Sequence, residues 1–470
     1  MKMPKPSCPR GSLLTLGCGL GLAALLPACA HMEKGRGHDT VSQLVEARSG
    51  HRTGWEQGSP EARQIQERVS ALLKGGLNRE RAVQIALINN PHLQETYDEL
   101  DVSQADLVQA GLLSNPTLSG SIGVQLGNTS GRPEYEVSIV QSFLDIFMLP
   151  LRKRVAEAQF DSETLRVAYA ALQLAAETSK EFAELQASEQ TVELMQSISE
   201  GADAAASLAT QQFDAGNVSE RAVASERAVS AQAELDLGRD RLRVLEHRER
   251  LNRLLGLWGP NAAWKSAQTL QAIPAHEPAL EHLEVTALKQ RLDVQAARKQ
   301  VETMDAALSM ARTSRYTGLV NVGAHLHQDV NGPRLLGPTM SLELPIFDQR
   351  QALIGRLEAQ RRQAQRRLDA LGLDVRSEVR LAKAQLDLSR HAAEQYLSAL
   401  LPLRRTVLEQ SELEYNAMQI GLYELLATKK AEIETFRAYL DTVRDYWIAH
   451  AELERALGGR VTSARNEKTQ

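Results

Sequence analysis

Aromatic residues and cysteines are scarce in this sequence of 470 residues. Phe, Trp and Tyr make up only 4% of it. Ala, Leu, Gln, Glu and Arg take their place, as expected of long helices packed in thin layers rather than around one thick core. A formal net charge of −5 gives no basic surface for nucleic acid. Neither an HExxH nor a Walker A sequence occurs, so we expect no enzyme and no cofactor.

The N-terminus has the pattern of an export signal. Basic residues precede an apolar run over 13–26, and the sequence LPAC (26–29) follows. A run this short, ending in small residues, is typical of a signal peptide rather than a spanning helix. LPAC resembles a bacterial lipobox, in which Cys29 would be lipidated and become the mature N-terminus; the alternative is a plain signal peptide with an incidental cysteine. Because Cys8 and Cys18 would leave with the signal, no internal disulfide, thiolate metal site or cysteine nucleophile is expected.

The rest of the sequence is duplicated at an offset of 201 or 202 residues. The matching landmarks are Ala158-Gln159 with Ala359-Gln360, Phe213-Asp214-Ala215 with Tyr415-Asn416-Ala417, and Leu255-Gly256 with Leu457-Gly458. We therefore predict the following organisation: 1–28 signal peptide, 29–78 extended and lipid-anchored N-terminal arm, 79–257 first repeat, 258–282 Gly- and Pro-containing linker, 283–458 second repeat, and 459–470 polar tail.

The pattern of each repeat predicts a helix, a pair of strands, a long helix, a tip and a second long helix, in that order. Residues 152–200 contain neither Gly nor Pro, and a helix over them would span about 74 Å. Apolar or small residues recur there with the three- and four-residue steps of a coiled coil. They are Leu165, Ala168, Leu172, Ala175, Ser179 and Phe182, and near the C-terminus Ile433, Phe436, Leu440, Val443 and Trp447. Such lengths exceed those of compact domains and favour the wall of a tube.

Four segments alternate between apolar and polar residues, as strands of about ten residues do when they span a membrane. Their apolar sets are Leu118, Ile122, Val124 and Leu126; Tyr135, Val137 and Ile139; Val320, Val322, Ala324 and Leu326; and Met340, Leu342 and Leu344. Turn-rich loops at 127–133 and 329–338 separate the members of each pair. A soluble sheet packed on helices would show the same alternation.

Four strands are too few to close a barrel, for which about eight is the smallest number. An open sheet edge in lipid leaves unpaired N–H and C=O groups that cost several kcal/mol each. If the strands span a membrane, several identical chains must therefore share one barrel. Two chains would supply eight strands and three would supply twelve; a lumen wide enough for polar residues favours three.

Several strings in this sequence resemble the TolC-like outer membrane efflux proteins. They are NNPHLQ (89–94), QAGLLSNPTLSGSIG (109–123), SLELPIFDQRQALI (341–354), FDAGNVSERAV (213–223) and YNAMQIGLYELL (415–426). The resemblance covers residues 79–458. It implies a mainly α fold with a small β part: a homotrimer with four strands per subunit in a transmembrane β-barrel, above a long coiled-coil α-helical barrel.

The same resemblance implies a passive conduit in the outer membrane that extends into the periplasm. Its partners would be outer-membrane lipid, a periplasmic adaptor and an inner-membrane pump, most often of the resistance-nodulation-division type. Cys29 matches the lipid-anchored branch of the family. Heavy-metal cations or drugs are the cargo classes that the resemblance suggests. The alternatives are a periplasmic adaptor lipoprotein and a coiled-coil scaffold; the duplication and the paired two-faced strands argue against the adaptor.

The resemblance also implies roles for the two helix tips, as adaptor-docking turns at the periplasmic end. The residues concerned are Ala215, Gly216, Asn217 and Val218 in the first repeat, and Met418, Gln419, Ile420 and Gly421 in the second. Met418 stands where the family pattern has Gly, which leaves the shape of the second tip open. Glu424 occupies a position where family members often carry the acidic ring of a gate; a solvated helix-surface carboxylate is the other interpretation.

Two further motifs could bind a ligand, but each is explained more simply by its place in the predicted structure. His325 and His327 would point from one strand face toward the lumen, but a metal site needs at least one more ligand, so we predict no metal site. The Arg-rich stretch 356–367 is most simply a solvated helix face.

Overall fold

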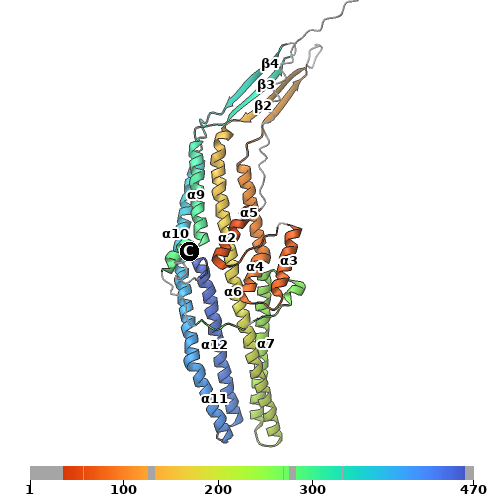
Figure 1. Cartoon of the computed structure of the whole chain (residues 1–470), viewed down its shortest axis with the longest axis vertical. Helices are drawn as coiled ribbons and strands as arrows, with labels where there is room; N and C mark the ends of the chain where they lie inside the picture. Colours follow the sequence, from red (N-terminus) through yellow and green to blue (C-terminus); the bar gives the residue numbers. More distant parts are fainter. Residues whose placement is uncertain are drawn as a thin grey trace, which may run out of the picture.

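The computed structural model describes residues 35–56, 58–124, 133–267, 269–274, 282–329 and 332–460. Figure 1 shows them as a long, narrow body, with the strands at one end and two helix turns at the other. The prediction of a mainly α chain with a small antiparallel sheet is confirmed. Among the described helices, none is both long enough and apolar enough to cross a membrane.

The N-terminal segment that we expected to be extended is largely helical. It forms α2 (His38–Ser49) and α3 (Ser59–Leu73). Helix α2 folds because Val41 and Val45 are fully buried in a cluster with Phe160 of the long helix that follows. This short apolar face was not predicted because the rest of the segment is polar. The arm lies against the middle of the body in Figure 1.

Both repeats follow the predicted order of elements, except that two helices rather than one precede each pair of strands. The first contains α4 (Arg79–Asn89), α5 (Pro91–Ala110), β1 (Thr117–Gly123), β2 (Glu134–Ser142), α6 (Leu144–Asp214) and α7 (Glu220–Leu255), and the 3-10 helix η2 (Gly259–Ala262) follows it. The second contains α8 (Leu283–Gln290), α9 (Leu292–Thr313), β3 (Val320–Gln328), β4 (Arg334–Leu342), α10 (Gln351–Gln395), the π-helix η3 (Tyr396–Leu400), α11 (Leu401–Asn416) and α12 (Leu422–Leu457).

The duplication is visible in the backbone as well as in the sequence. Gly256 ends α7 with a φ of +64°, and Gly458 ends α12 with a φ of +80°. Both are left-handed helix caps, a conformation that glycine adopts without the steric cost other residues meet. The matching Leu-Gly pairs of the sequence are therefore equivalent helix ends.

The long helices pack along the predicted small-residue seam. Helix α6 has 71 residues, about 107 Å at 1.5 Å per residue. Ala168, Leu172, Ala175 and Phe182 are buried along it. The matching helix of the second repeat is interrupted by η3, just before Pro402. Proline has no N–H to bond the carbonyl four residues back, and the wider turn of η3 absorbs the interruption.

The helices form one layer whose order changes along the body. Near the tips the order is α11, α12, α6, α7, and nearer the sheet it is α10, α9, α6, α5 (Figure 1). In both parts α6 is an inner member of the layer. Helices α7 and α11 form its two edges near the tips, so each has one side without a neighbour among the described elements of this chain.

The four described strands form one antiparallel sheet in the order β1-β2-β3-β4. The central pairing, β2 with β3, joins the two repeats. The strands have seven to nine residues, shorter than expected. Residues 334–338, predicted as loop because of their Gly and Pro, belong to β4. Pro338 lies opposite Ala324 in this strand. Most of the predicted loop 127–133 lies outside the described residues.

Candidate functional site

The sheet has one apolar and one polar face, as the alternation predicted. Cross-strand neighbours share a face, because side chains alternate with period two. The pairs Val137–Leu326 and Val322–Met340 lie on the apolar face, and Ser119–Ser138 and Asn321–Ser341 lie on the polar face. The hydroxyls of Ser119 and Ser138 are hydrogen-bonded at 2.8 Å.

The apolar face is not covered by any of the helices that the structure describes. Side chains that are more than half exposed include Leu118, Ile122, Leu336, Met340 and Leu342. In water, a contiguous set of exposed large apolar residues marks a surface that binds another apolar phase. The soluble alternative, in which the sheet packs on its own helices, is therefore wrong.

The two histidines lie on the polar face as predicted. The ring of His325 covers Gly337 of the neighbouring strand, where an added Cβ would lie 3.2 Å from the ring. His327 is paired with Glu136, and its Nε2 lies 3.9 Å from Oε1 of Glu134. Within the described residues no group of three or more His, Cys, Asp or Glu side chains is placed to hold a metal ion.

The first helix tip is a tight turn with two characteristic hydrogen bonds. The N–H of Gly216 donates to the carbonyl of Phe213 at 2.8 Å, and the N–H of Asn217 donates to that of Gln212 at 2.8 Å. Gly216 has a φ of +76°. This is a left-handed cap at the end of α6, and Ala215 and Val218 flank it.

The second tip has the same shape despite its different sequence. The N–H of Met418 donates to the carbonyl of Tyr415 at 2.9 Å, and the N–H of Gln419 donates to that of Glu414 at 2.8 Å. Met418 has a φ of +56° and is 92% exposed. A side chain in this conformation costs about 1–2 kcal/mol. The open question about the second tip is thus answered: Met418 keeps the turn that glycine would make, under strain.

Beyond Gln419, three further predicted residues belong to this tip. Ile420 is partly exposed, and Gly421 caps the start of α12. Glu424 is exposed in the first turn of α12, where a carboxylate is favoured by the helix dipole. In this conformation Glu424 has the surroundings of a solvated surface residue, and its gating role stays a prediction.

Helix α12 is tied to the α6–α7 pair by polar contacts at successive heights. Nearest the tip, the hydroxyl of Tyr423 donates to Oε1 of Gln212 at 3.1 Å. Higher up, Arg437 lies 3.5 Å from the buried carboxylate of Asp240, and Arg444 lies 3.6 Å from Glu184. These contacts join the two repeats of one chain into a single wall.

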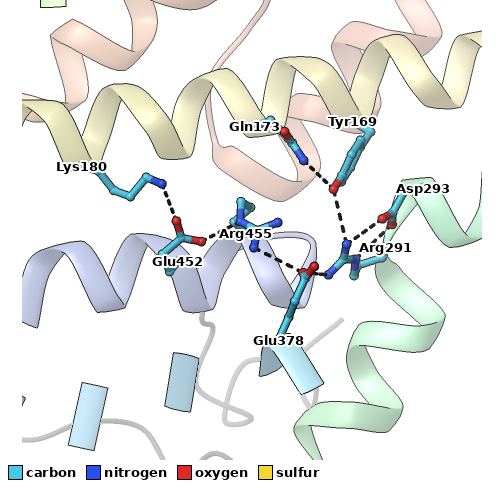
Figure 2. Close-up of polar contacts among 8 residues, drawn as sticks. All are labelled: Tyr169, Gln173, Lys180, Arg291, Asp293, Glu378, Glu452 and Arg455. Atoms are coloured by element: carbon cyan, nitrogen blue, oxygen red, sulfur yellow. Dashed lines mark hydrogen bonds and ion pairs between the residues drawn. The ribbon is translucent and has the colours of Figure 1, made fainter. Parts of the chain in front are cut away.

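A buried arginine organises the middle of the body (Figure 2). Arg291, whose side chain is only 2% exposed, forms ion pairs of 2.6 Å with Asp293 and with Glu378. It also donates to the hydroxyl of Tyr169 at 3.4 Å. Arg455 donates to the same Glu378 at 3.3 Å, so the ends of α8, α9 and α12 meet α6 and α10 here.

The network continues from Arg455 to α6. Arg455 donates to Glu452 at 2.7 Å, and Glu452 pairs with Lys180 (Figure 2). Burial alone would raise the pKa of Glu452, but hydrogen bonds from Lys180 and Arg455 outweigh it and lower that pKa. This network was not predicted from the sequence, because its members carry no periodic signal. The one available hint was Arg291-Leu292-Asp293 at the start of a predicted helix.

Cys29 lies outside the described residues, so its lipidation stays a prediction. The C-terminal tail is described only as far as Arg460, whose N–H donates to the carbonyl of Arg48 at 2.8 Å.

Known proteins are similar to this chain in sequence and in fold. The sequence model of the outer membrane efflux protein family matches residues 82–257. The cobalt-zinc-cadmium resistance protein CzcC of Cupriavidus metallidurans is 26% identical over 399 residues, which cover 82% of this chain and 90% of that protein.

Two solved structures share the fold at low identity. The outer membrane channel CmeC of Campylobacter jejuni has a TM-score of 0.69 at 15% identity, and the match covers 86% of this chain and 88% of that one. A membrane protein from Pseudomonas aeruginosa has a TM-score of 0.66 at 20% identity, covering 81% of this chain and 93% of that one.

An apolar-faced sheet carried at the end of such long helices is the architecture of an outer-membrane channel subunit, and the matches agree with it. Residues 82–257 match the outer membrane efflux protein family, and the chain is an outer membrane efflux channel protein. The proteins that it resembles are channels rather than enzymes.

Proposed function

We propose that three copies of this chain form a passive, lipid-anchored duct that crosses the outer membrane and reaches into the periplasm as part of a tripartite pump. The observation that carries the proposal is the uncovered apolar face of a sheet that ends in two unpaired edges, β1 and β4. Neither edge can remain unpaired in lipid. Pairing β4 of one copy with β1 of the next satisfies both edges, and three copies close twelve strands.

The helix layer has matching free sides. On α7, Ala233 faces α6, and Leu242 lies nine residues further on. Nine residues turn the helix by about 900°, so Leu242 points away from α6. The exposed apolar residues of this side are Leu235, Leu242 and Leu245, and those of the opposite edge are Leu397, Leu400, Leu403 and Val407.

The two apolar sides also lie at the same height. Counted from Asn217, Leu235 is 18 residues above its tip; counted from Met418, Leu400 is 18 residues above the other tip. Both are therefore about 27 Å from the end of the body. Packing α7 of one copy on η3 and α11 of the next buries both sides and closes the same ring as the strands.

A lipid on Cys29 can reach the membrane end of the body. Arg36 lies over the ring of Phe160 at 5.7 Å, and Phe147, near the sheet, is about 20 Å further up α6. The seven residues from Cys29 to Arg36 span up to about 25 Å when extended. Since one acyl chain binds membrane only weakly, the barrel would be the main anchor and the lipid an additional one.

The tips would carry the contacts with the periplasmic adaptor and, through it, the pump. Both are solvent-exposed turns at the end remote from the sheet, and the exposed Met418 offers an apolar contact. We assign Glu424 to the gate, where three copies around one axis would repel one another and attract cations. The name of CzcC supports divalent metal cations as cargo, and drugs are the second class.

Two adjacent leucines on opposite faces of β4 test the membrane assignment. Leu336 lies on the apolar face, 78% exposed, and Leu335 lies on the polar face, 56% exposed. An arginine facing lipid costs about 2–4 kcal/mol at the membrane midplane and less near its surface. We expect Leu336→Arg to reduce the heat-resistant trimer on gels. Leu335→Arg should still insert and should lower the cation conductance in planar bilayers. Equal effects of the two variants would contradict a lipid-facing sheet.

A further inference from the structure

The lower edge of the apolar face does not stop at the sheet. The N–H of Phe143 donates to the carbonyl of Val320 at 2.8 Å and so extends the β2–β3 ladder by one residue. By alternation, Phe143 lies on the apolar face together with Val137 and Ile139. The ring of Phe147, in the first turns of α6, packs on that of Phe143, with centroids 5.4 Å apart. Both phenylalanines are about half or more exposed.

The same side of α6 then becomes cationic. Positions seven apart on a helix lie on one side, so Arg154 follows Phe147 in line, about 10 Å further from the sheet. Arg154 is exposed, and among the described residues it has no ion-pair partner. Its neighbour Lys153 is also exposed and lies 3.7 Å from Glu157. The stripe Phe143, Phe147 and Arg154 is thus apolar toward the sheet and positively charged away from it.

These spacings match the boundary of a bilayer. The headgroup region adds about 5–8 Å on each side of the hydrocarbon core. Aromatic rings favour the boundary of that core, and long cationic side chains extend into the headgroups beyond it. With Phe147 at the boundary, the guanidinium of Arg154 reaches the level of the phosphates.

We propose that this stripe, Phe143–Phe147–Arg154, is a binding site for the headgroup of an anionic phospholipid in the periplasmic leaflet of the outer membrane. The inference rests on the proposed function, because it requires the apolar face to contact lipid. Charge complementarity selects an anionic headgroup over a zwitterionic one, and continuity with the apolar face selects a membrane lipid over a soluble phosphate. The site would fix the height of the channel in the bilayer.

Native mass spectrometry of the full-length trimer, titrated with phosphatidylglycerol or with phosphatidylcholine, tests the site. A surface cation near an anionic membrane contributes about 1 kcal/mol, which is about a five-fold change in affinity. We expect Arg154→Gln to lower phosphatidylglycerol binding about five-fold and to leave phosphatidylcholine binding unchanged. Arg154→Lys should restore most of the binding. Arg404→Gln, an exposed arginine on α11 far from the sheet, is the matched control and should have no effect.

The results of this titration distinguish failure of the lipid-site proposal from failure of the channel proposal. If Arg154→Gln forms a conducting trimer that binds phosphatidylglycerol as the wild type does, the lipid site is overturned and the channel stands. If the wild-type protein neither forms trimers nor enters bilayers, the proposed function fails and the lipid site fails with it.

Discussion

Met418 occupies at the second helix tip the left-handed backbone position that Gly216 occupies at the first. Their φ values are +56° and +76°, and the hydrogen bonds of the two turns match one for one. A methionine in this conformation is strained, whereas a glycine is not. Strain that persists in a fold is found most often where a side chain serves function. The chain therefore holds an exposed methionine at one tip at a cost in stability.

Replacing Met418 with glycine should stabilise the chain while impairing efflux. We expect Met418→Gly to raise the free energy of unfolding by up to about 1 kcal/mol, because the strain is removed although the unfolded chain gains freedom. Urea titration measures this change. Resistance to metal salts in a deletion strain should fall, because the exposed apolar contact is lost. A variant with full resistance would show that Met418 makes no contact that matters.

Gly216→Ala tests the opposite change at the first tip. It introduces a side chain where φ is positive, so we expect it to destabilise the chain by about 1 kcal/mol. No atom lies within 4 Å of the added Cβ, so a steric clash does not contribute. An unchanged urea midpoint would contradict the strained-turn interpretation of both tips.

Removing the buried Arg291 should be strongly destabilising. Arg291→Met leaves Asp293 and Glu378 without their shared cation, and breaking a buried pair on one side costs about 3–5 kcal/mol. Because Glu378 is 36% exposed, we expect the lower end of this range in urea unfolding. Arg361→Met is the control: Arg361 pairs with Asp305, but both are about half exposed, so its loss should cost less than about 1 kcal/mol. Similar losses for the two variants would contradict the role assigned to the buried network.

A charge on the free side of α7 should prevent assembly without unfolding the chain. We expect Leu242→Glu to give monomers in detergent, because three carboxylates would be buried between subunits. Helix content by circular dichroism should stay unchanged, since Leu242 is 55% exposed in the single chain. Gln232→Glu places the same charge about a quarter turn away on α7 and should leave the trimer intact. A trimeric Leu242→Glu would show that α7 does not meet a neighbouring copy.

The contact between the N-terminal arm and the C-terminus should weaken in acid. Glu80 lies 2.9 Å from His51 and 3.2 Å from Arg460. The hydrogen bond with His51, helped by the charges of Arg79 and Arg460 against the effect of burial, lowers the pKa of Glu80 from 4.5 to about 2. A depressed carboxyl pKa stabilises the fold above the unfolded value, and that stability is lost as the pH falls from about 4.5 to about 2.

Comparing wild type with Glu80→Gln across pH isolates this contribution. The wild type should be the more stable above pH 5, by less than about 1 kcal/mol because Glu80 is half exposed. The difference should shrink toward zero as the pH falls to about 2. A difference that is independent of pH would mean that the carboxylate charge does not stabilise the arm.

The sequence by itself determined the two repeats, the long helices and the two-faced strands. The helix and strand patterns are local, because a period of two or of three and a half residues appears in neighbouring side chains such as Leu165, Ala168 and Leu172. The helical arm was missed because α2 carries only two fully buried valines, Val41 and Val45, in a polar segment.

Only the tertiary structure decided which distant polar groups meet. Arg291 and Glu378 are 87 positions apart, and no local pattern pairs them. Their pairing exists because packed helices bring the two side chains together away from water, where an unpaired charge would be far too costly. The equal shape of the two tips was likewise beyond the sequence, since packing of the helices on either side holds Met418 in a backbone conformation that methionine does not prefer.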